Sequence, residues 1–446
     1  MLVDGEHYPP VTRWGVLAAR SMGHEPIAAL FVGGTEKIVA SGPPDLGIPT
    51  LVPEGGLREP SGAARREALG AAIDELRPDA VLDLSDEPVL GYRERMELAA
   101  VTLARGLPYL GSDFRLEPPI WAPAIPVPTV AVIGTGKRTG KTAIAGETAR
   151  VAAEAGMNPV VVAMGRGGPP EPQVAEAGSV TVEWLLELVR RGQHAASDYL
   201  EDALFTGVPT VGARRVGGGL AGMPFATNVR EAAEVAVQLG AGLVILEGSG
   251  SSMPPVPWDA GILVAPAGVP HEYVGGYLGP LRILLSDLVV ITMSDGSHEP
   301  ENLFALESHV RRLREDARFV VTDFQPAPLG DVRDTGVYLT TTAPPEVAAR
   351  QVEHLERTFG CRVVGYSTRL ADRKGLAEDM DRAQDYEILV TELKAAAVDV
   401  ACERAVARGA RVVFADNRPV TTGGDGPLPE MLRHTLDLAV ERHRHR

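Results

Sequence analysis

The sequence predicts an α/β protein in which a central domain with a parallel sheet is flanked by a small N-terminal α/β domain and a C-terminal α/β domain. Short apolar runs alternate with helical periodicity along the chain, which is the pattern of a buried parallel sheet covered by helices. A proline-rich stretch, EPPIWAPAIPVP at 117–128, interrupts this pattern and indicates a rigid linker. Because 446 residues exceed one ordinary hydrophobic core, we predict three domains, at 1–125, 126–330 and 331–446.

The N-terminal domain is predicted from apolar runs such as IAALFVGG and AVLDLSDEP. These runs alternate with helical stretches such as REALGAAIDELRP and RERMELAAVTLARG. The alternation indicates a small parallel sheet, and the sequence of this domain indicates no role for it.

The central domain is predicted from short apolar runs that follow Val127 and mostly end in Gly, Asp or Ser: TVAVIG, PVVVAMG, GLVILEG, GILVAPAG, DLVVITMSDG and RFVVTDF. Such strands suit a buried parallel sheet, and ligands bind at the carboxyl ends of its strands. The C-terminal domain is predicted from the runs GVYLTTT, CRVVGYS and RVVFADN, which alternate with helical stretches such as PEVAARQVEHLERTFG.

The composition excludes several classes of partner and site. The chain has 43 basic and 59 acidic residues, a net charge of −16, so neither nucleic acid nor an anionic membrane is expected as its main partner. Cys361 and Cys402 lie outside any CxxC spacing, which argues against a disulfide framework or a zinc site. The N-terminus lacks a basic region followed by an apolar run, and the strongest apolar stretch is broken by Ser286 and Asp287. We therefore expect a soluble, cytoplasmic protein.

A phosphate-binding loop is predicted at GTGKRTGKT, residues 134–142, between a strand and a helix. The first glycine of this loop, Gly134, lies one residue earlier than the standard P-loop consensus requires, and the loop length is that of the GTxxxxGKT loop of dethiobiotin synthetases. Backbone N–H groups and the helix N-terminus of such a loop hold nucleotide phosphates, here those of ATP. The predicted ATP-binding residues are Gly134, Thr135, Gly136, Thr139, Gly140, Lys141 and Thr142.

Lysine is rare in this chain, and two of its lysines lie in the loop. Because 38 of the 43 basic residues are arginine, a retained lysine marks a place where a compact ammonium is needed. Lys141 is expected to reach the β- and γ-phosphates. Lys137 and Arg138 either contact the γ-phosphate or a second anion, or form a solvated basic turn. By the same argument Lys394, in TELKAAAVDVA, is a candidate functional residue.

A magnesium site is predicted from Thr142 and Glu247. The Thr142 hydroxyl would bind Mg²⁺, which bridges nucleotide phosphates and needs hard oxygen ligands. Glu247 ends the apolar run GLVILE, where a carboxylate from a neighbouring strand is expected. This glutamate also resembles the E-G-x-G element of dethiobiotin and cobyrinate synthetases.

A second phosphate site is predicted from arginines that lie beside glycines. Arg166 directly follows an apolar run, and Arg214 and Arg215 precede the glycines of VGARRVGGG. Guanidinium and backbone groups can converge on one phosphate in such a loop.

Three other charged stretches have less specific patterns. Asp198, Glu201 and Asp202 in SDYLEDAL have helical spacing, and we expect a helix N-terminus or a solvated acidic face more than metal or substrate chemistry. Asp295 follows an apolar run at the place where related nucleotide-binding proteins contact the base. The terminal ERHRHR is expected to be a frayed, solvated tail.

Taken together, these motifs resemble those of the cyclic 2,3-diphosphoglycerate synthetase family, in an order that covers nearly the whole chain. They are GTGKRTGKT, AMGRGGPPEP, SDYLEDAL, GARRVGGGLAG, LEGSGSSMPPV and TELKAAAVDVA. The resemblance implies an ATP- and Mg²⁺-dependent ligase that closes 2,3-diphosphoglycerate into its cyclic phosphoanhydride and releases ADP and phosphate. The residues that it assigns are Gly140, Lys141 and Thr142 for ATP, and Arg166, Arg214 and Arg215 for the substrate phosphates.

Other functions are compatible with the same loop. It could serve an ATPase, kinase or ligase for another small phosphorylated or carboxylic acid, because a fold does not fix the chemistry. It could also serve a nucleotide-switch ATPase that binds a protein partner. We further expect a homo-oligomer, most simply a dimer.

Overall fold

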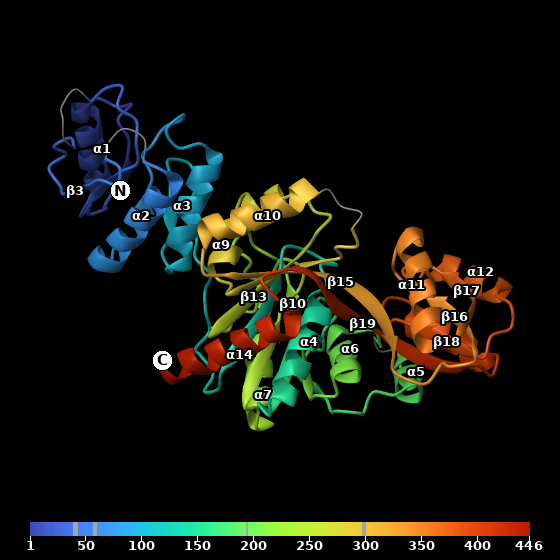
Figure 1. The fold of residues 1–446 in the computed structure, drawn as a ribbon. Helices are drawn as coiled ribbons and strands as arrows, with labels where there is room; N and C mark the ends of the chain where they lie inside the picture. The colour runs from blue at the N-terminus through green and yellow to red at the C-terminus, as the bar shows by residue number, and fades with distance from the viewer. Residues whose placement is uncertain (39–42, 57–59, 193–194, 297–299) are drawn as a thin grey trace.

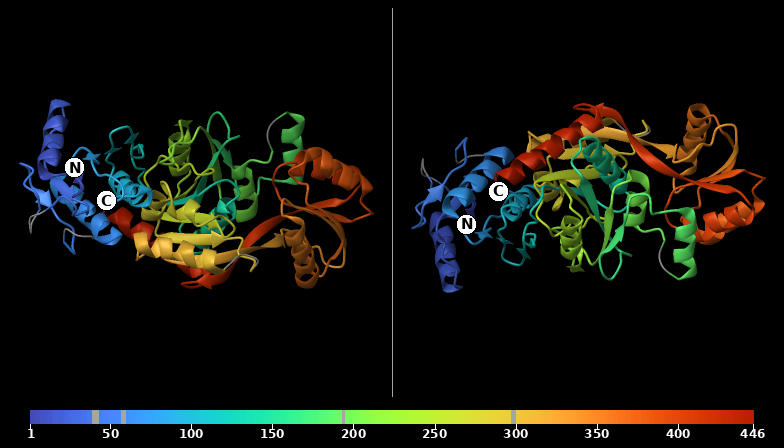
Figure 2. Two further views of the ribbon diagram at one scale, coloured as in Figure 1. Left: turned by 90° about the horizontal axis from the view of Figure 1, so that it is seen from above. Right: turned by 90° about the horizontal axis from the view of Figure 1, so that it is seen from below.

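The structure is a computed structural model that describes residues 1–38, 43–56, 60–192, 195–296 and 300–446. The N-terminal, central and C-terminal parts of the chain lie one after another along an elongated molecule (Figure 1). The same arrangement is seen from above and from below in Figure 2. A large, mostly parallel sheet with helices on both faces forms the centre, which confirms the α/β fold class predicted from the alternation of apolar runs and helical stretches.

The N-terminal part is built from two small sheets and the helices packed on them. Strands β1, β2 and β3 are parallel, and β4 and β5 are parallel with β6 antiparallel beside them. A parallel bridge between Leu2 and Asp83 sets β1 beside β4. The elements are β1 (Leu2–Val3), α1 (Pro9–Ser21), β2 (Ala29–Phe31), β3 (Thr50–Leu51), α2 (Gly62–Leu76), β4 (Val81–Leu82), α3 (Tyr92–Ala104), β5 (Tyr109–Leu110) and β6 (Arg115–Leu116).

The large sheet runs through the central and C-terminal parts in the order β11-β10-β8-β12-β7-β13-β14-β15-β19-β18-β16-β17, with β9 beside β10. From β10 to β15 its strands are parallel, so their carboxyl ends share one edge. The central strands are β7 (Thr129–Gly134), β8 (Pro159–Gly165), β9 (Gln173–Ala175), β10 (Thr210–Val216), β11 (Ala226–Thr227), β12 (Leu243–Glu247), β13 (Ala260–Pro266), β14 (Leu288–Thr292) and β15 (Arg318–Pro328).

Alternate residues of the central strands pack on helices at opposite faces of the sheet. Val130 and Val132 of β7 face the core under α4 and α14, whereas Ala131 and Ile133 face the core under α7 and α10. The central helices are α4 (Lys141–Glu154), α5 (Val182–Arg190), α6 (Asp198–Thr206), α7 (Val229–Gln238), α8 (Glu272–Gly275), α9 (Gly279–Leu284) and α10 (Pro300–Leu313).

The C-terminal part continues the large sheet because the long strands β15 and β19 pair antiparallel. Leu393 and Phe414 of this part pack in one cluster with Leu185 of α5 and Leu200 of α6, which holds the C-terminal part against the central domain. Its elements are β16 (Gly336–Thr340), α11 (Pro345–Phe359), β17 (Arg362–Ser367), α12 (Arg373–Arg382), β18 (Ile388–Thr391), the π-helical turn η1 (Ala397–Cys402), α13 (Glu403–Ala407) and β19 (Arg411–Gly424).

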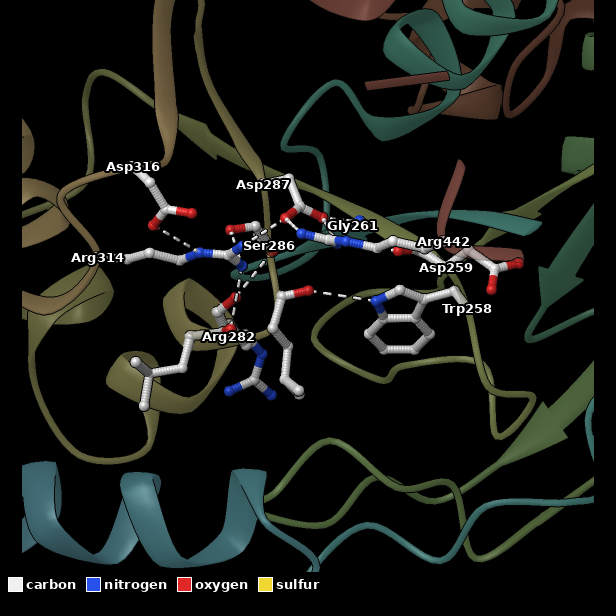
Figure 3. Close-up of polar contacts among 11 residues, drawn as sticks. Trp258, Asp259, Gly261, Arg282, Ser286, Asp287, Arg314, Asp316 and Arg442 are labelled. Carbon is white, nitrogen blue, oxygen red and sulfur yellow. Dashed lines mark hydrogen bonds and ion pairs between the residues drawn. The ribbon is translucent and has the colours of Figure 1, made fainter. Parts of the chain in front are cut away.

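The last helix, α14 (Leu428–Arg444), returns to the central sheet and is fixed there by charged residues (Figure 3). Arg442 donates hydrogen bonds to both carboxylate oxygens of Asp287, at 2.9 and 3.0 Å. Arg446 forms an ion pair with Asp259 at 3.1 Å. The predicted frayed tail is therefore wrong, because carboxylates at the amino ends of β13 and β14 bind the cations of this helix end. Among the described residues, no helix combines the length and the apolar character that a membrane span requires.

Candidate active site

The phosphate loop joins β7 to α4 at the carboxyl edge of the sheet. Gly140 has a φ of 86°, and a Cβ there would lie 2.6 Å from the Phe324 ring, so both the backbone and the packing require glycine. The Lys141 side chain folds back over the loop, and its Nζ donates hydrogen bonds to the Gly136 carbonyl at 2.7 Å and to Thr139 Oγ1 at 3.2 Å. The sequence motif therefore forms a closed loop around a buried ammonium.

Four charged side chains shift the pKa of the Lys141 ammonium. Burial lowers the pKa of Lys141 to about 8, the nearby Glu247 and Asp198 raise it, and Arg166 and Arg215 lower it. These groups come from β12, α6 and the ends of β8 and β10, which are far apart in the sequence. The fold thus brings residues from five of the six quoted motifs to one edge of the sheet.

Thr142 and Glu247 meet beside the loop. The Thr142 hydroxyl donates to Glu247 Oε1 at 2.7 Å, and parallel pairing of β12 with β7 sets Glu247 opposite Val132. Burial raises the pKa of Glu247 to about 7, and its Oε2 atom is buried without a hydrogen-bond donor. A hydroxyl beside a carboxylate that lacks a donor is a set of hard oxygens that fits Mg²⁺.

The acidic residues of α6 are buried in this site and do not form the solvated face that we considered from their spacing. Glu201 is 7% exposed and Asp202 is 1% exposed. Burial raises the pKa of both carboxyl groups, and Glu247 raises the pKa of Asp202 further. Asp198 begins the helix, as expected for an acidic residue at a helix N-terminus, and also acts on Lys141.

Lys394 reaches this site from the C-terminal part. Its ammonium forms an ion pair with Glu201 Oε1 at 3.2 Å. Burial lowers the pKa of Lys394, but the carboxylates of Glu201 and Glu392 raise it, and the net effect is a rise. The structure thus pairs this lysine with the acidic helix beside the phosphate loop.

The predicted arginines separate into two groups. Arg166 and Arg215 both approach Gly250, where a Cβ would lie 2.5 Å and 3.2 Å from their respective Nη2 atoms. Arg215 also donates to the Ser249 carbonyl at 2.8 Å, and burial together with the charge of Arg166 lowers its pKa. Arg214 instead donates to the Pro169 carbonyl at 2.8 Å, because successive strand residues point to opposite faces.

Arg166 and Arg215 form an arginine pair with an uncompensated charge. Neither guanidinium forms an ion pair with a carboxylate of the described residues. Two guanidinium groups that face one glycine-lined loop are suited to bind an anion such as a phosphate.

Lys137 and Arg138 are exposed on the loop, and neither forms a hydrogen bond or ion pair within the described part of the chain. Arg138 has a φ of 60°, a conformation that is uncommon outside glycine. The pair is therefore solvated in the ligand-free protein, and both cations are accessible to an anion. Asp295 forms an ion pair with Arg350 of α11, which the sequence did not indicate.

The sequence comparisons cover nearly the whole chain. Three profiles of one family match in order: the N-terminal domain of cyclic 2,3-diphosphoglycerate synthetase at 1–117, its P-loop domain at 129–323 and its C-terminal domain at 328–418. A cyclic 2,3-diphosphoglycerate synthetase from Rubrobacter xylanophilus is 46% identical over 97% of this chain and 96% of its own. One from Methanothermobacter thermautotrophicus is 42% identical over 98% of this chain and 96% of its own.

Similarity to solved structures is weaker. LpxK from Aquifex aeolicus, solved in complex with ATP, is 13% identical, and the match covers 71% of this chain and 91% of that chain. Its TM-score of 0.43 supports no inference about the site.

Proposed function

Because this chain belongs to the cyclic 2,3-diphosphoglycerate synthetase family, we propose that it is the ATP- and Mg²⁺-dependent ligase that closes 2,3-diphosphoglycerate into its cyclic phosphoanhydride. The supporting observation is that a buried loop lysine, a hydroxyl–carboxylate pair and an unpaired pair of arginines share one edge of the sheet. These groups match a nucleotide triphosphate, a divalent cation and a second phosphate.

The reaction joins the two phosphate monoesters of one molecule in two displacements. An oxygen of one phosphate attacks the γ-phosphorus of ATP, the bond from that phosphorus to the bridging oxygen breaks, and ADP leaves. An oxygen of the other phosphate then attacks the inner phosphorus of the new diphosphate group, and inorganic phosphate leaves. Each turnover consumes one ATP and yields one anhydride, with charge neutralisation and positioning as the main sources of catalysis.

On this proposal the loop residues 134–142 hold ATP, and Lys141 neutralises the β- and γ-phosphates. Thr142 and Glu247 would hold Mg²⁺, which would supply neutralisation of the charge that develops on the phosphates. Asp198 lies at the same place and is a further candidate for the metal side of the site.

Arg166 and Arg215 hold the substrate phosphate that does not receive the γ-phosphoryl group. Arg214 is assigned a smaller role, because its guanidinium donates to the Pro169 carbonyl. Lys137 and Arg138 are proposed to contact phosphate groups at the mouth of the loop, and Lys394 is proposed to hold Glu201 of the acidic helix in place beside them. A dimeric state and a cytoplasmic location stay predictions.

The proposal is tested by measuring ADP release with 2,3-diphosphoglycerate, with other phosphorylated and carboxylic acids, and with no acid present. Strong stimulation by 2,3-diphosphoglycerate alone is expected. Stimulation by another acid would indicate a different ligase or kinase, and slow turnover that no acid changes would indicate a nucleotide switch.

A further inference from the structure

The acidic helix α6 places the carboxyl groups of Glu201 and Asp202 near Glu247, the proposed magnesium ligand. Both carboxylate oxygens of Asp202 and the Oε2 atom of Glu247 are buried without a hydrogen-bond donor. The two carboxyl groups lie in contact, since each alters the pKa of the other through a direct side-chain interaction. The interaction raises the pKa of Asp202 and lowers the pKa of Glu247, which is the pattern of two buried carboxyl groups that share one proton. A hard cation can take the place of such a proton, because buried carboxylates are normally paired or bind a metal.

The charges around these two groups do not balance. The carboxyl groups that act on one another are those of Asp198, Glu201, Asp202 and Glu247. The ammonium groups that act on them are Lys141 and Lys394, so four carboxyl groups share two ammonium groups. A divalent cation would supply the positive charge that the ionised forms of Asp202 and Glu247 need.

The two ammonium groups are already engaged elsewhere. Lys394 forms its ion pair with Glu201, and Lys141 donates to the carbonyl and hydroxyl groups of the phosphate loop. The carboxyl groups that remain without a cation of their own are those of Asp202 and Glu247. Adjacent carboxylate oxygens without a donor between them are suited to bind one hard cation as neighbouring ligands.

We propose that Asp202 and Glu247 together bind a divalent cation in the nucleotide-free protein, before ATP enters the site. The inference rests on the proposed function in taking Glu247 as a metal ligand, and it adds Asp202 and the order of binding. Magnesium at phosphate sites is commonly held by one or two carboxylates together with the phosphates themselves. Here the second carboxylate and the Thr142 hydroxyl add protein oxygens to Glu247, and water would complete the octahedral coordination of the cation until the phosphates arrive.

The test is a Mn²⁺ titration of the full-length, nucleotide-free protein at pH 8, with free Mn²⁺ measured by electron paramagnetic resonance. We expect one bound Mn²⁺ that Mg²⁺ displaces. Asp202→Asn and Glu247→Gln should each raise the Kd by at least about tenfold, because each removes one charged ligand. Asp437→Asn, a matched loss of charge on the exposed side of α14, should leave the Kd unchanged. No bound Mn²⁺ in the wild-type protein, or an unchanged Kd in Asp202→Asn, would overturn the proposal.

A stability measurement separates loss of the metal site from a failure to fold. Without metal, Asp202→Asn should melt at the same temperature as wild type or above it, since it replaces a buried carboxyl whose charged form lacks a cation. Mg²⁺ should raise the Tm of the wild-type protein more than that of Asp202→Asn, because the variant binds the metal more weakly, and an equal rise in both would contradict the proposal. If the cyclic product forms although the nucleotide-free protein binds no Mn²⁺, only this inference fails. If Mn²⁺ binds as predicted but no cyclic product forms, only the proposed function fails.

Discussion

Buried charges gather at both edges of the central sheet, and the two groups differ in how completely they are paired. At the amino edge, Asp287 accepts hydrogen bonds from the Gly261 amide at 2.9 Å and from Arg442, and it forms an ion pair with Arg314 (Figure 3). At the carboxyl edge, Asp202 and Glu247 have carboxylate oxygens with no donor.

The paired charges at the amino edge stabilise the fold, whereas the unpaired charges at the carboxyl edge are available to bind ligands. A buried carboxylate with several donors is stabilised by them, so it ties α10 and α14 to the sheet. Carboxylates without donors, and the arginine pair without a carboxylate partner, cost stability in the ligand-free protein. We infer that these charges at the carboxyl edge serve binding, because a nucleotide, a metal and an anionic substrate would pair with them.

The largest effect is expected at the loop lysine. Lys141→Ala should lower ATP turnover by at least about a hundredfold, because it removes the cation that we propose faces the γ-phosphate. The fold should be kept, since the loop backbone is closed by glycine and by packing. The matched control is Lys374→Ala, which removes an exposed lysine of α12 and should leave turnover unchanged. Near wild-type ATP turnover in Lys141→Ala would place the nucleotide elsewhere.

The next effect is expected at the arginine pair. Replacing Arg166 and Arg215 with alanine should raise the KM for the acidic substrate by about tenfold to a hundredfold, as for the loss of charge-assisted hydrogen bonds. The KM for ATP should change little. Arg214→Ala is the comparison variant, and it should have a smaller effect because its side chain binds the Pro169 carbonyl. An equal increase in both KM values would mean that the pair serves the nucleotide or the fold.

A smaller effect, on stability, is expected from Glu247, and it depends on pH. Burial raises the pKa of Glu247 from 4.5 to about 7, so the folded state favours the protonated carboxyl, and stability from this group is lost as pH rises from 4.5 to 7. In metal-free buffer at pH 8, Glu247→Gln should therefore be more stable than wild type by roughly 3 kcal/mol. The gain should shrink near pH 5. Urea unfolding at both pH values checks this, and a variant less stable than wild type at pH 8 would show that Glu247 is fully paired.

The smallest effect is expected at the amino edge, and it has the opposite sign. Arg442→Ala should lower the free energy of unfolding by about 1–2 kcal/mol, because Asp287 loses one of its donors while keeping Arg314 and the Gly261 amide. The kcat for ATP should be unchanged at low temperature. Unfolding in urea and steady-state kinetics of the same sample give both quantities. A loss of kcat without a loss of stability would mean that the two edges are coupled.

The sequence was sufficient where a local pattern carries the structure. The strand, glycine turn and helix around Lys141 follow from the local order of residues, and so does the alternation that predicts the fold class. The sequence was insufficient where side chains meet through tertiary packing. Glu201 and Asp202 look like a polar helix face, and only the packing of α6 between the sheet and the C-terminal part buries them.

Two further limits have the same cause. Arg214 and Arg215 are adjacent in the sequence, but the strand continues through them and directs them to opposite faces. The ERHRHR end has the composition of a free tail, and its order comes from Asp259 and Asp287, which lie far away in the chain. A local sequence pattern cannot predict a contact with a residue that lies on a distant element of the chain.

Phosphorus NMR of the reaction tests the central claim most directly. With 2,3-diphosphoglycerate, ATP and Mg²⁺, we predict that the two monoester signals of the substrate are replaced by a pair of coupled upfield signals, in step with the formation of ADP and phosphate. The pair should be absent without ATP, without Mg²⁺ and with Lys141→Ala. Rapid ATP hydrolysis while the monoester signals persist unchanged would contradict the account.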